Sequence, residues 1–391
     1  MRRFGIMSLA ATGLLLAPMA IAPAATPQIS APHVILVEAA TGTVLFQRKA
    51  DDLVAPASLA KLMTVEVVFD QLQLGNFKLD DQFVISENAW RKGGAPSGGS
   101  TMYAAIHSRV SVGDLLRGTI IHSGNDASIA LAEGIAGNEA AFVRMMNDRA
   151  RELGLTKSYY TNSTGLPDPQ MRVTARELVL LTRHIITTYP ERYRLYGERE
   201  FTWNKIRQLN RNPLLPMDIG ADGLKTGFTN EAGYNLVGSA VQNGLRLIVV
   251  VTGLKTAKDR ADEAKKLLDW GFKDFDTRLL FAEGQTVAEA KVYGGAQGSV
   301  PLVANAPVKL MVPRGTSDRI TAKMVYTGPV QAPVREGQPI GNLQIWRGDA
   351  KVLEVPLKAS ESVGVGSIPR RAFDAVADLV INLFRSTVKR L

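Results

Sequence analysis

The sequence predicts an α/β (α+β) main domain, then a smaller all-β domain and a C-terminal amphipathic helix. Three observations predict this order. Strand-like segments stand early and late in the first 280 residues, helical periodicity fills the space between them, and that periodicity stops after about Phe281. A chain of 391 residues also exceeds the usual size of one compact domain. We therefore expect four segments, at residues 1–24, 25–280, 281–368 and 369–391.

The first segment has the pattern of a secretory signal peptide. Met1-Arg2-Arg3 is a basic start, an apolar run reaches Ile21, and small residues follow at 22–25. The apolar run is short for a membrane span, and an A-x-A sequence is typical of a cleavage site. We predict cleavage after Ala24. An uncleaved anchor is the alternative, which Pro18 disfavours because proline interrupts a helix.

The second segment opens with a predicted hairpin and a helix. His33–Glu38 and Thr43–Phe46 have the composition of strands on either side of a glycine-containing turn. The stretch 56–66 has good helix formers and a proline at its start, where proline is tolerated. Ser58 is therefore expected in the first turn of a helix.

Helices and then strands follow, and together they predict a sheet with helices packed over it. Apolar residues recur at helical spacing over 114–134, 139–153, 174–187 behind a threonine cap, and 259–270. Two buried strands are predicted at 235–240 and 245–251. Beyond residue 281, short apolar runs such as 308–312 and 342–346 alternate with glycine and proline turns, which indicates a small all-β module.

Composition restricts the chemistry that the chain can perform. There is no cysteine, which excludes disulfides and thiol nucleophiles. None of the four histidines lies in a G-x-S-x-G elbow or at a spacing typical of metal ligands. We expect no metal and no cofactor, and we interpret His122 as a local structural residue. The formal charge is +9, or +7 without Arg2 and Arg3. An exported basic protein is expected to meet anionic membranes or polymers, not nucleic acid.

The last segment is predicted to lie on a membrane surface. From Arg370 to Leu391, phenylalanine, valine and leucine recur at spacings of three and four, and arginine and lysine outnumber aspartate on the opposite face. An apolar face with a basic polar face suits a helix lying in the membrane interface. A terminal helix docked on the protein's own core is the alternative.

One short motif offers a nucleophile with its base. Ser58-Leu59-Ala60-Lys61 is an S-x-x-K on the predicted helix, and positions three apart share a helix face. A serine hydroxyl needs a base, and a lysine amine serves when it is neutral. Burial and a neighbouring positive charge lower a lysine pKa. We expect Lys225 to supply that charge.

Two further motifs supply polar groups for a substrate. Ser123-Gly124-Asn125 is an S-x-N whose hydroxyl can relay a proton and whose amide can hold a peptide group. Lys225-Thr226-Gly227 is a K-T-G ahead of a predicted strand, where a cation and a hydroxyl could receive a carboxylate. A second S-x-N at residues 86–88 follows an apolar run and is interpreted as a strand end.

With these motifs in order, the chain resembles the low-molecular-mass penicillin-binding proteins, the serine D-alanyl-D-alanine carboxypeptidases. The resemblance covers about residue 31 to the C-terminal helix. The longer strings that carry it lie at residues 123–127, 208–212, 222–227 and 231–236. It implies a penicillin-binding/β-lactamase-like transpeptidase fold, removal of the terminal D-alanine from peptidoglycan pentapeptide stems, inhibition by β-lactams, and a position on the periplasmic face of the inner membrane.

The resemblance also implies roles for individual residues. Ser58 is the acylated nucleophile, Lys61 its base, and Ser123 and Asn125 form the opposite wall. The substrate-binding residues are Asn125, Lys225, Thr226, Gly227 and Arg211. The oxyanion hole uses the backbone N–H groups of Ser58 and Phe228. Phe228 departs from the family pattern, in which similar members carry histidine, so the resemblance implies no side-chain role for Phe228 in deacylation.

Three alternatives remain open at this point. A class A β-lactamase would need a glutamate within an E-x-x-L-N string between the second and third motifs, and none occurs between Asn125 and Lys225. A D,D-endopeptidase would use the same chemistry on cross-links. A non-enzymatic domain could bind peptidoglycan without cleaving it, although all the motif residues are present.

Overall fold

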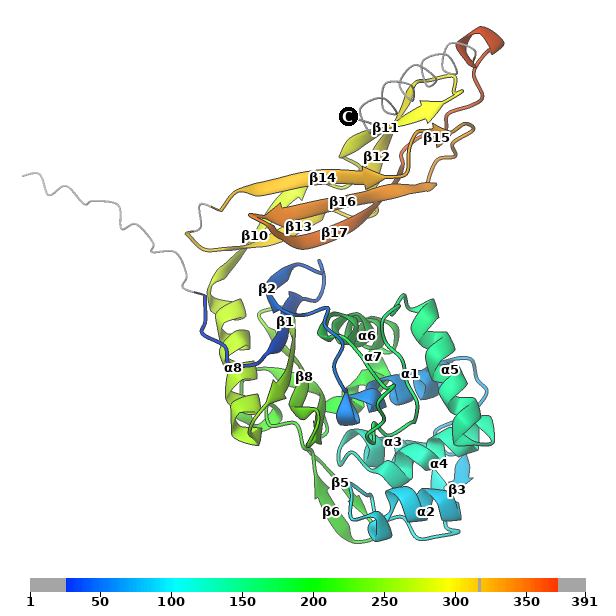
Figure 1. The fold of residues 1–391 in the computed structure, drawn as a ribbon, viewed down its shortest axis with the longest axis vertical. Coiled ribbons are helices and arrows are strands. Elements are labelled where there is room, and N and C mark those ends of the chain that lie inside the picture. The colour runs from blue at the N-terminus through cyan, green and yellow to red at the C-terminus, as the bar shows by residue number, and fades with distance from the viewer. Residues whose placement is uncertain (1–25, 316–317, 372–391) are drawn as a thin grey trace, which may run out of the picture.

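The computed structural model describes residues 26–315 and 318–371. The predicted signal peptide lies outside the described residues, as does the predicted terminal helix apart from residues 369–371. The chain forms a lower α/β domain and an upper, elongated β domain, which Figure 1 shows along the colour gradient from blue to red.

An antiparallel sheet of five strands forms the centre of the lower domain, in the order β2-β1-β9-β8-β7. The predicted hairpin is confirmed as β1 (His33–Glu38) and β2 (Val44–Arg48), and the predicted late strands are β8 (Gly233–Gln242) and β9 (Leu245–Leu254). β7 (Ala221–Thr229) pairs only with β8 and is an edge strand of this sheet.

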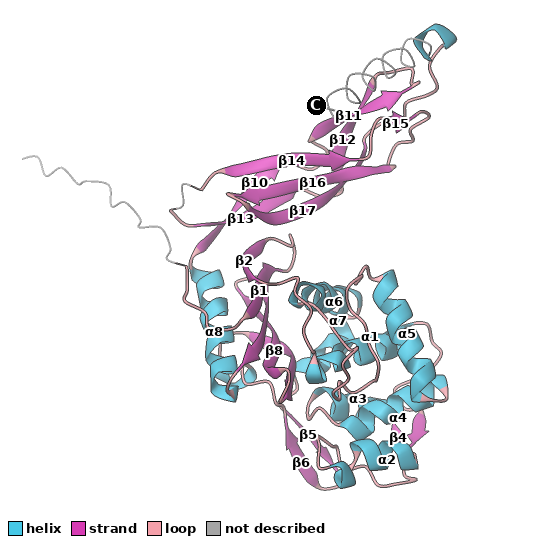
Figure 2. Cartoon of the chain, viewed as in Figure 1, coloured by secondary structure: helices cyan, strands magenta, loops and turns pink. Residues whose placement is uncertain are grey.

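Helices cover both faces of the sheet (Figure 2). α8 (Ala257–Lys273) packs on one face with Leu236, Val249 and Val251. The opposite face carries a larger hydrophobic core built around α1 and α3 to α6. The helices on that side are α1 (Lys61–Gln73), α2 (Glu87–Gly93), α3 (Val112–Ile120), α4 (Asn125–Ala136), α5 (Glu139–Glu152), α6 (Ala175–Thr188) and α7 (Pro190–Tyr193).

The structure corrects several predicted boundaries. The stretch 114–134 is two helices, α3 and α4, separated by residues 121–124. The K-T-G lies inside strand β7, not ahead of a strand. Ser58 lies in a 3₁₀ turn, Ala57–Ala60, that precedes α1. Ser86 does not end a strand: β3 stops at Val84, and Ser86 caps α2 by accepting a hydrogen bond from the backbone of Ala89.

Two small antiparallel strand pairs and three further 3₁₀ turns complete the lower domain. One pair is β3 (Gln82–Val84) with β4 (Arg109–Ser111), and the other is the hairpin of β5 (Glu200–Trp203) and β6 (Ile206–Leu209). The 3₁₀ turns are Ala95–Ser97, Arg194–Gly197 and Leu215–Met217.

The upper domain is built from strands, as predicted for the all-β module. A six-stranded sheet has the order β14-β16-β17-β12-β11-β15, and β10 pairs with β13 beside it. β10 (Phe275–Phe281) runs through the predicted domain boundary at 280/281. The other strands are β11 (Ala288–Tyr293), β12 (Ser299–Ala304), β13 (Val308–Pro313), β14 (Ile320–Tyr326), β15 (Val330–Gln331), β16 (Pro339–Arg347) and β17 (Ala350–Ala359).

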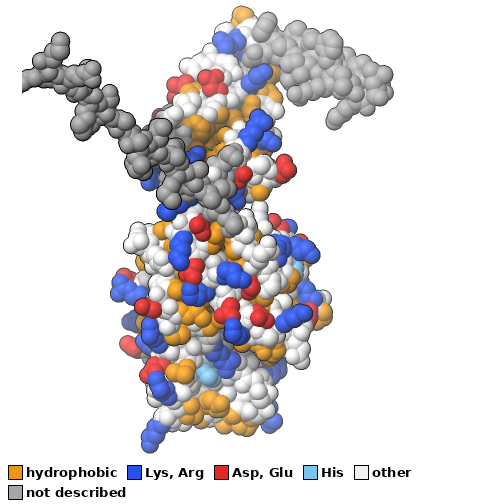
Figure 3. Space-filling view, turned by 90° about the vertical axis from the view of Figure 1, so that its left-hand side faces the viewer, with side chains coloured by type: hydrophobic (Ala, Val, Ile, Leu, Met, Phe, Trp, Pro, Cys, Tyr) orange, Lys and Arg blue, Asp and Glu red, His pale blue; other side chains and the backbone are white. Residues whose placement is uncertain are grey.

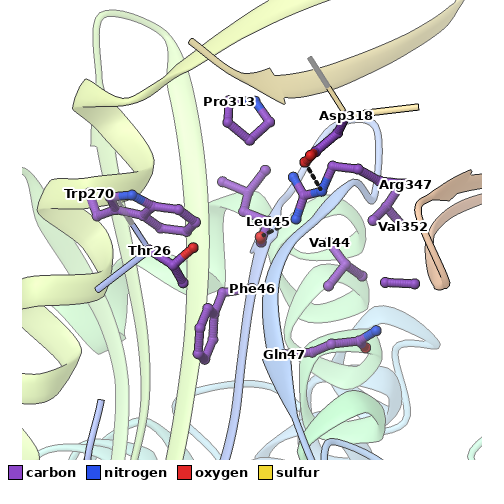
Figure 4. A pocket seen from close by; sticks show the side chains of 11 residues that line it. Thr26, Val44, Leu45, Phe46, Gln47, Trp270, Pro313, Asp318, Arg347 and Val352 are labelled. Atoms are coloured by element: carbon purple, nitrogen blue, oxygen red, sulfur yellow. Dashed lines mark hydrogen bonds and ion pairs between the residues drawn. The ribbon is translucent and has the colours of Figure 1, made fainter. Parts of the chain in front are cut away.

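The two domains meet at strand β2 and at the turn that joins it to β1. Arg347 of the upper domain donates from Nη2 to the carbonyl oxygen of Leu45 at 3.1 Å and lies 3.9 Å from the carboxylate of Asp318. Figure 4 shows this arginine on one side of a junction cavity of about 330 Å³, with Trp270 and Phe46 on the other side. A direct hydrogen bond and shared apolar walls thus join the domains.

Charge on the face drawn in Figure 3 is mixed, because lysine and arginine side chains alternate there with aspartate and glutamate. The net basic charge therefore does not form a uniform field on that face. Within residues 26–315 and 318–371, no helix is both long enough and apolar enough to cross a membrane.

Candidate active site

Ser58 is presented by a tight backbone arrangement at the edge of the sheet. Ala57 adopts a left-handed conformation with φ of +48°, at the start of the 3₁₀ turn that carries Ser58. Two glycines allow this turn to pack closely. A Cβ on Gly165 would lie 1.8 Å from the Ala57 carbonyl oxygen, and one on Gly227 would lie 3.1 Å from the Ser58 nitrogen. The Ser58 backbone therefore lies between two segments that approach it this closely only because each has a glycine at the point of contact.

Lys61 is fully buried, and its amine contacts three oxygen atoms. Its Nζ donates to Asn125 Oδ1 at 2.7 Å and to the Thr164 carbonyl oxygen at 2.5 Å, and it lies 3.2 Å from Ser58 Oγ. A neutral amine has only two N–H groups. When those two donate to Asn125 and Thr164, the lone pair is left for the Ser58 hydroxyl, which then donates to the amine.

The environment favours that neutral form. The pKa of Lys61 is lowered to about 7, first by burial and then by the charge of Arg211, while Asp126 acts in the opposite direction. We expected Lys225 to supply a lowering charge. Arg211 supplies one, and Lys61 and Lys225 also influence each other, because the charge of Lys61 lowers the pKa of Lys225. Asp126 is itself held by hydrogen bonds from the backbone of Met102 and Ala104 and from the Thr101 hydroxyl.

Ser123 lies between α3 and α4 in a left-handed conformation with φ of +64°. Such a conformation is uncommon for a residue with a side chain and is often held at functional sites. The Ser123 hydroxyl oxygen accepts a hydrogen bond from Lys225 Nζ at 2.8 Å. The break between the helices therefore aims this hydroxyl at strand β7.

Lys225 is buried and also donates to the Thr226 carbonyl oxygen at 3.1 Å. Burial lowers its pKa well below the usual range, and the charges of Lys61, Arg211 and Arg260 lower it further. Several basic side chains therefore lie around Lys225. An anionic ligand bound among them would offset their mutual repulsion.

The first two motifs meet directly at Asn125. Its Oδ1 holds Lys61, and a Cβ on Gly99 would lie 3.2 Å from its Nδ2. No hydrogen bond from Nδ2 to another described residue is formed, so this donor can serve a ligand. Thr226 is also buried, one residue after Lys225.

Arg211 follows β6 and is held beside Ser123 by three contacts. Its backbone nitrogen donates to the Ile121 carbonyl oxygen at 3.2 Å, Nη1 donates to Ser100 Oγ at 2.6 Å, and Nη2 lies 3.3 Å from His122 Nε2. Arg211 therefore lies at the same site as the three motifs. Its charge lowers the pKa of both Lys61 and Lys225.

Phe228 follows the K-T-G on the edge strand, and the residue is 48% exposed to solvent. Its ring packs on Tyr234 with centroids 4.2 Å apart, and the guanidinium of Arg260 lies 5.6 Å from the Tyr234 ring on the α8 side. The phenylalanine ring therefore extends an aromatic surface along the edge strand. It cannot exchange protons as a histidine at this position could.

Sequence reasoning missed three groups at this site. Thr164 contributes a backbone carbonyl, which no residue type encodes. Arg260 lies at the start of α8, where its Nε is buried without a hydrogen-bond partner in the described part of the chain. His122, interpreted as merely structural, contacts Arg211. His122 was considered beforehand but given no role at the site, and no motif marked Arg260.

Comparison with protein families gives two matches along the chain. Residues 20–256 match the family described as D-alanyl-D-alanine carboxypeptidase, and residues 275–365 match the family described as penicillin-binding protein 5, C-terminal domain. The first match contains the S-x-x-K, the S-x-N and the K-T-G. The second covers the strands of the upper domain.

Curated relatives match over most of their length. A D-alanyl-D-alanine carboxypeptidase, DacC, of Escherichia coli is 40% identical over 93% of this chain and 92% of its own. One from Haemophilus influenzae, DacA, is 40% identical over 92% and 91%.

Solved structures match both domains. Penicillin-binding protein 5 from Haemophilus influenzae superposes with a TM-score of 0.73 and 39% identity, covering 87% of this chain and 99% of that one. The ampicillin-bound form of penicillin-binding protein D2 from Listeria monocytogenes has a TM-score of 0.58 and 30% identity over 64% of this chain and all of its own.

Proposed function

The chain belongs to the D-alanyl-D-alanine carboxypeptidase family, and from this premise we propose that it removes the terminal D-alanine of peptidoglycan pentapeptide stems through an acyl-enzyme on Ser58. The contact between Lys61 Nζ and Ser58 Oγ carries this assignment of the nucleophile. The enzyme is a serine-type peptidase that binds penicillin, and we propose that penicillin acylates Ser58 as well.

Acylation begins when the Ser58 hydroxyl transfers its proton to the neutral amine of Lys61. The Ser58 oxygen attacks the carbonyl carbon between the two terminal D-alanines and forms a C–O bond. The C–N bond then breaks, and the leaving amine takes up the proton that Lys61 accepted, relayed through the hydroxyl of Ser123, which Lys225 contacts. Water next hydrolyses the ester, which regenerates Ser58 and releases the shortened stem.

The negative charge on the carbonyl oxygen in the transition state needs fixed donors. We assign these to the backbone N–H groups of Ser58 and Phe228. The close approach of Gly227 to the Ser58 nitrogen supports this pairing, because the two backbones could not come together with a side chain between them. The edge position of β7 supports it too, since one side of the strand faces away from β8.

The terminal carboxylate of the substrate is assigned to a group of basic residues. Lys225, Arg211 and Arg260 lie close enough to influence one another, and no carboxylate is among the groups that shift their pKa values. Lys225 is buried, and neither it nor the two arginines forms an ion pair with a described carboxylate, which favours an anionic ligand. Thr226 and Gly227 would line the same subsite, and the free Nδ2 of Asn125 would bind the substrate's peptide carbonyl.

We further infer an exported enzyme on the periplasmic face of the inner membrane. The basic start, apolar run and A-x-A of residues 1–24 support export, and the basic amphipathic pattern of residues 370–391 supports peripheral attachment. On such a surface the cell-wall peptides would be within reach of Ser58, and roles in cell-wall biogenesis and cell shape would follow.

Release of free D-alanine from a synthetic pentapeptide tests the activity. The wild-type enzyme is expected to release it and Ser58→Ala is expected not to. Absence of release by folded wild-type enzyme that still reacts with penicillin would overturn the carboxypeptidase assignment and favour cleavage of cross-linked peptides, which can be assayed on a dimeric muropeptide with the same protein.

A further inference from the structure

We propose that His122 is a positioning residue that holds the guanidinium of Arg211 in the active site, and that protonation of its imidazole releases this guanidinium. The inference rests on the proposed function, in which Arg211 helps to receive the substrate carboxylate. It concerns a histidine for which the acyl-transfer mechanism above has no use.

His122 and Arg211 are brought together by their backbones. His122 is the residue before Ser123, in the break between α3 and α4, and Arg211 lies just beyond β6. The hydrogen bond from the Arg211 nitrogen to the Ile121 carbonyl oxygen, at 3.2 Å, fixes the two segments side by side. The side-chain contact between them is therefore built on anchored backbone.

The Arg211 side chain is held by two neutral groups. Nη1 donates to Ser100 Oγ at 2.6 Å and Nη2 to His122 Nε2 at 3.3 Å. No ion pair of Arg211 with a carboxylate is formed in the described part of the chain, so its charge stays available for a ligand. Losing either neutral contact would free a long side chain that has many alternative rotamers.

The contact defines the protonation state of the histidine. A guanidinium only donates hydrogen bonds, so Nε2 of His122 must be the acceptor and the ring proton must reside on Nδ1. Protonation places a second proton on Nε2, which then faces the N–H group of Nη2. Two donors and two positive charges cannot share that contact, and Arg211 is expected to turn away.

The groups around the imidazole keep it neutral near neutral pH. Burial lowers the pKa of His122, and the charges of Arg211 from the β6 side and Lys225 from β7 lower it further. The Leu209 backbone and Asp126 of α4 act in the opposite direction. The imidazole therefore gains its proton only below its ordinary pKa, and substrate affinity should fall on the acid side.

The kinetic test compares wild type, His122→Gln and His122→Ala from pH 5 to 8, with exposed His107→Gln as the matched control. Glutamine keeps an acceptor oxygen and does not titrate. For wild type we expect KM to rise as the pH falls. For His122→Gln the acid rise in KM should disappear, while the dependence of kcat on Lys61 stays. For His122→Ala, KM should be raised about tenfold already at neutral pH, as expected for one lost hydrogen bond to a charged group.

A KM profile of His122→Gln that still rises in acid like that of wild type would overturn the proposal, as would an unchanged KM in His122→Ala. Labelling of each variant by fluorescent penicillin distinguishes failure of the proposed function from failure of the proposed role of His122. If wild type is not labelled, the proposed function has failed. If every variant is labelled and the KM profiles coincide, only the role of His122 has failed.

A second measurement reads the tautomer directly. The chain has four histidines, so ¹⁵N-histidine labelling gives few signals, and comparison with His122→Gln assigns the one of interest. We expect the neutral Nδ1–H form at pH 7. Observation of the Nε2–H form would contradict the contact with Arg211.

Discussion

The Nζ atom of Lys61 lies 3.2 Å from Ser58 Oγ, and its two shorter hydrogen bonds go to Asn125 Oδ1 and the Thr164 carbonyl oxygen. Those two acceptors use both N–H groups of a neutral amine and turn its lone pair to the hydroxyl. The geometry thus explains how a lysine can act as a base at this position.

The rate of acylation should rise with pH through about 7. The pKa of Lys61 is lowered to about 7, and only the neutral form can accept the proton of Ser58. Below that pH the amine is charged and the rate should fall about tenfold per pH unit. Stopped-flow measurement of penicillin acylation from pH 5 to 9 gives the profile. A rate that falls as pH rises through this range would contradict the role of Lys61.

Replacing Lys225 by alanine should weaken recognition of the substrate carboxylate. A charge-assisted hydrogen bond contributes about 1.5–3 kcal/mol, so KM for a peptide ending in a free carboxylate should rise about 10- to 100-fold. A matched peptide with a C-terminal amide shows whether the loss concerns the carboxylate. Its binding should change little, and an equal loss for both peptides would refute the assignment.

The Gly165→Ala variant should lose acylation because the new Cβ would lie 1.8 Å from the Ala57 carbonyl oxygen and displace the turn that carries Ser58. Gly154→Ala is a matched control: both glycines have positive φ, +80° and +73°, but nothing lies within 4 Å of a Cβ at Gly154. Each variant should lose about 1–2 kcal/mol of stability from its backbone conformation. Penicillin acylation should fall only in Gly165→Ala. Equal acylation by both folded variants would show that the new Cβ does not displace the turn that carries Ser58.

Deleting residues 370–391 should move the enzyme from the membrane fraction to the soluble periplasmic fraction. An apolar helix face with neighbouring arginine and lysine binds the interface of an anionic bilayer. Fractionation followed by immunoblotting checks this, and penicillin labelling of the truncated protein checks that it still folds. An unchanged distribution would mean that the tail packs elsewhere, for example on the protein itself.

The parts of the site that depend on local spacing could be predicted from the sequence. Ser58 and Lys61 are three residues apart on one helical turn, so their contact follows from spacing alone. The contact of Ser123 with Lys225 joins residues 102 positions apart. The motif set assigned both residues to one site but did not predict this contact. The sheet and its covering helices followed from hydrophobic periodicity, which is a strong signal in long segments.

The remainder of the site depends on backbone geometry and tertiary packing. A carbonyl such as that of Thr164 is available in every residue, so its role cannot be seen in a sequence. A turn at Ser123 could be expected between two apolar helical runs, and the structure confirms it, but the left-handed backbone of Ser123 leaves no signal in the sequence. β7 was missed since glycine, lysine and threonine interrupt the alternation expected of a strand. Arg260 reaches the site only because α8 packs behind β8.

Peptide mapping by mass spectrometry after reaction with benzylpenicillin tests the central assignment most directly. We predict one penicilloyl group, attached to the peptide that contains Ser58, and no adduct on that peptide in Ser58→Ala. The acyl-enzyme at Ser58 would be contradicted by an adduct on the peptide that contains Ser123, or by folded wild-type protein that carries none.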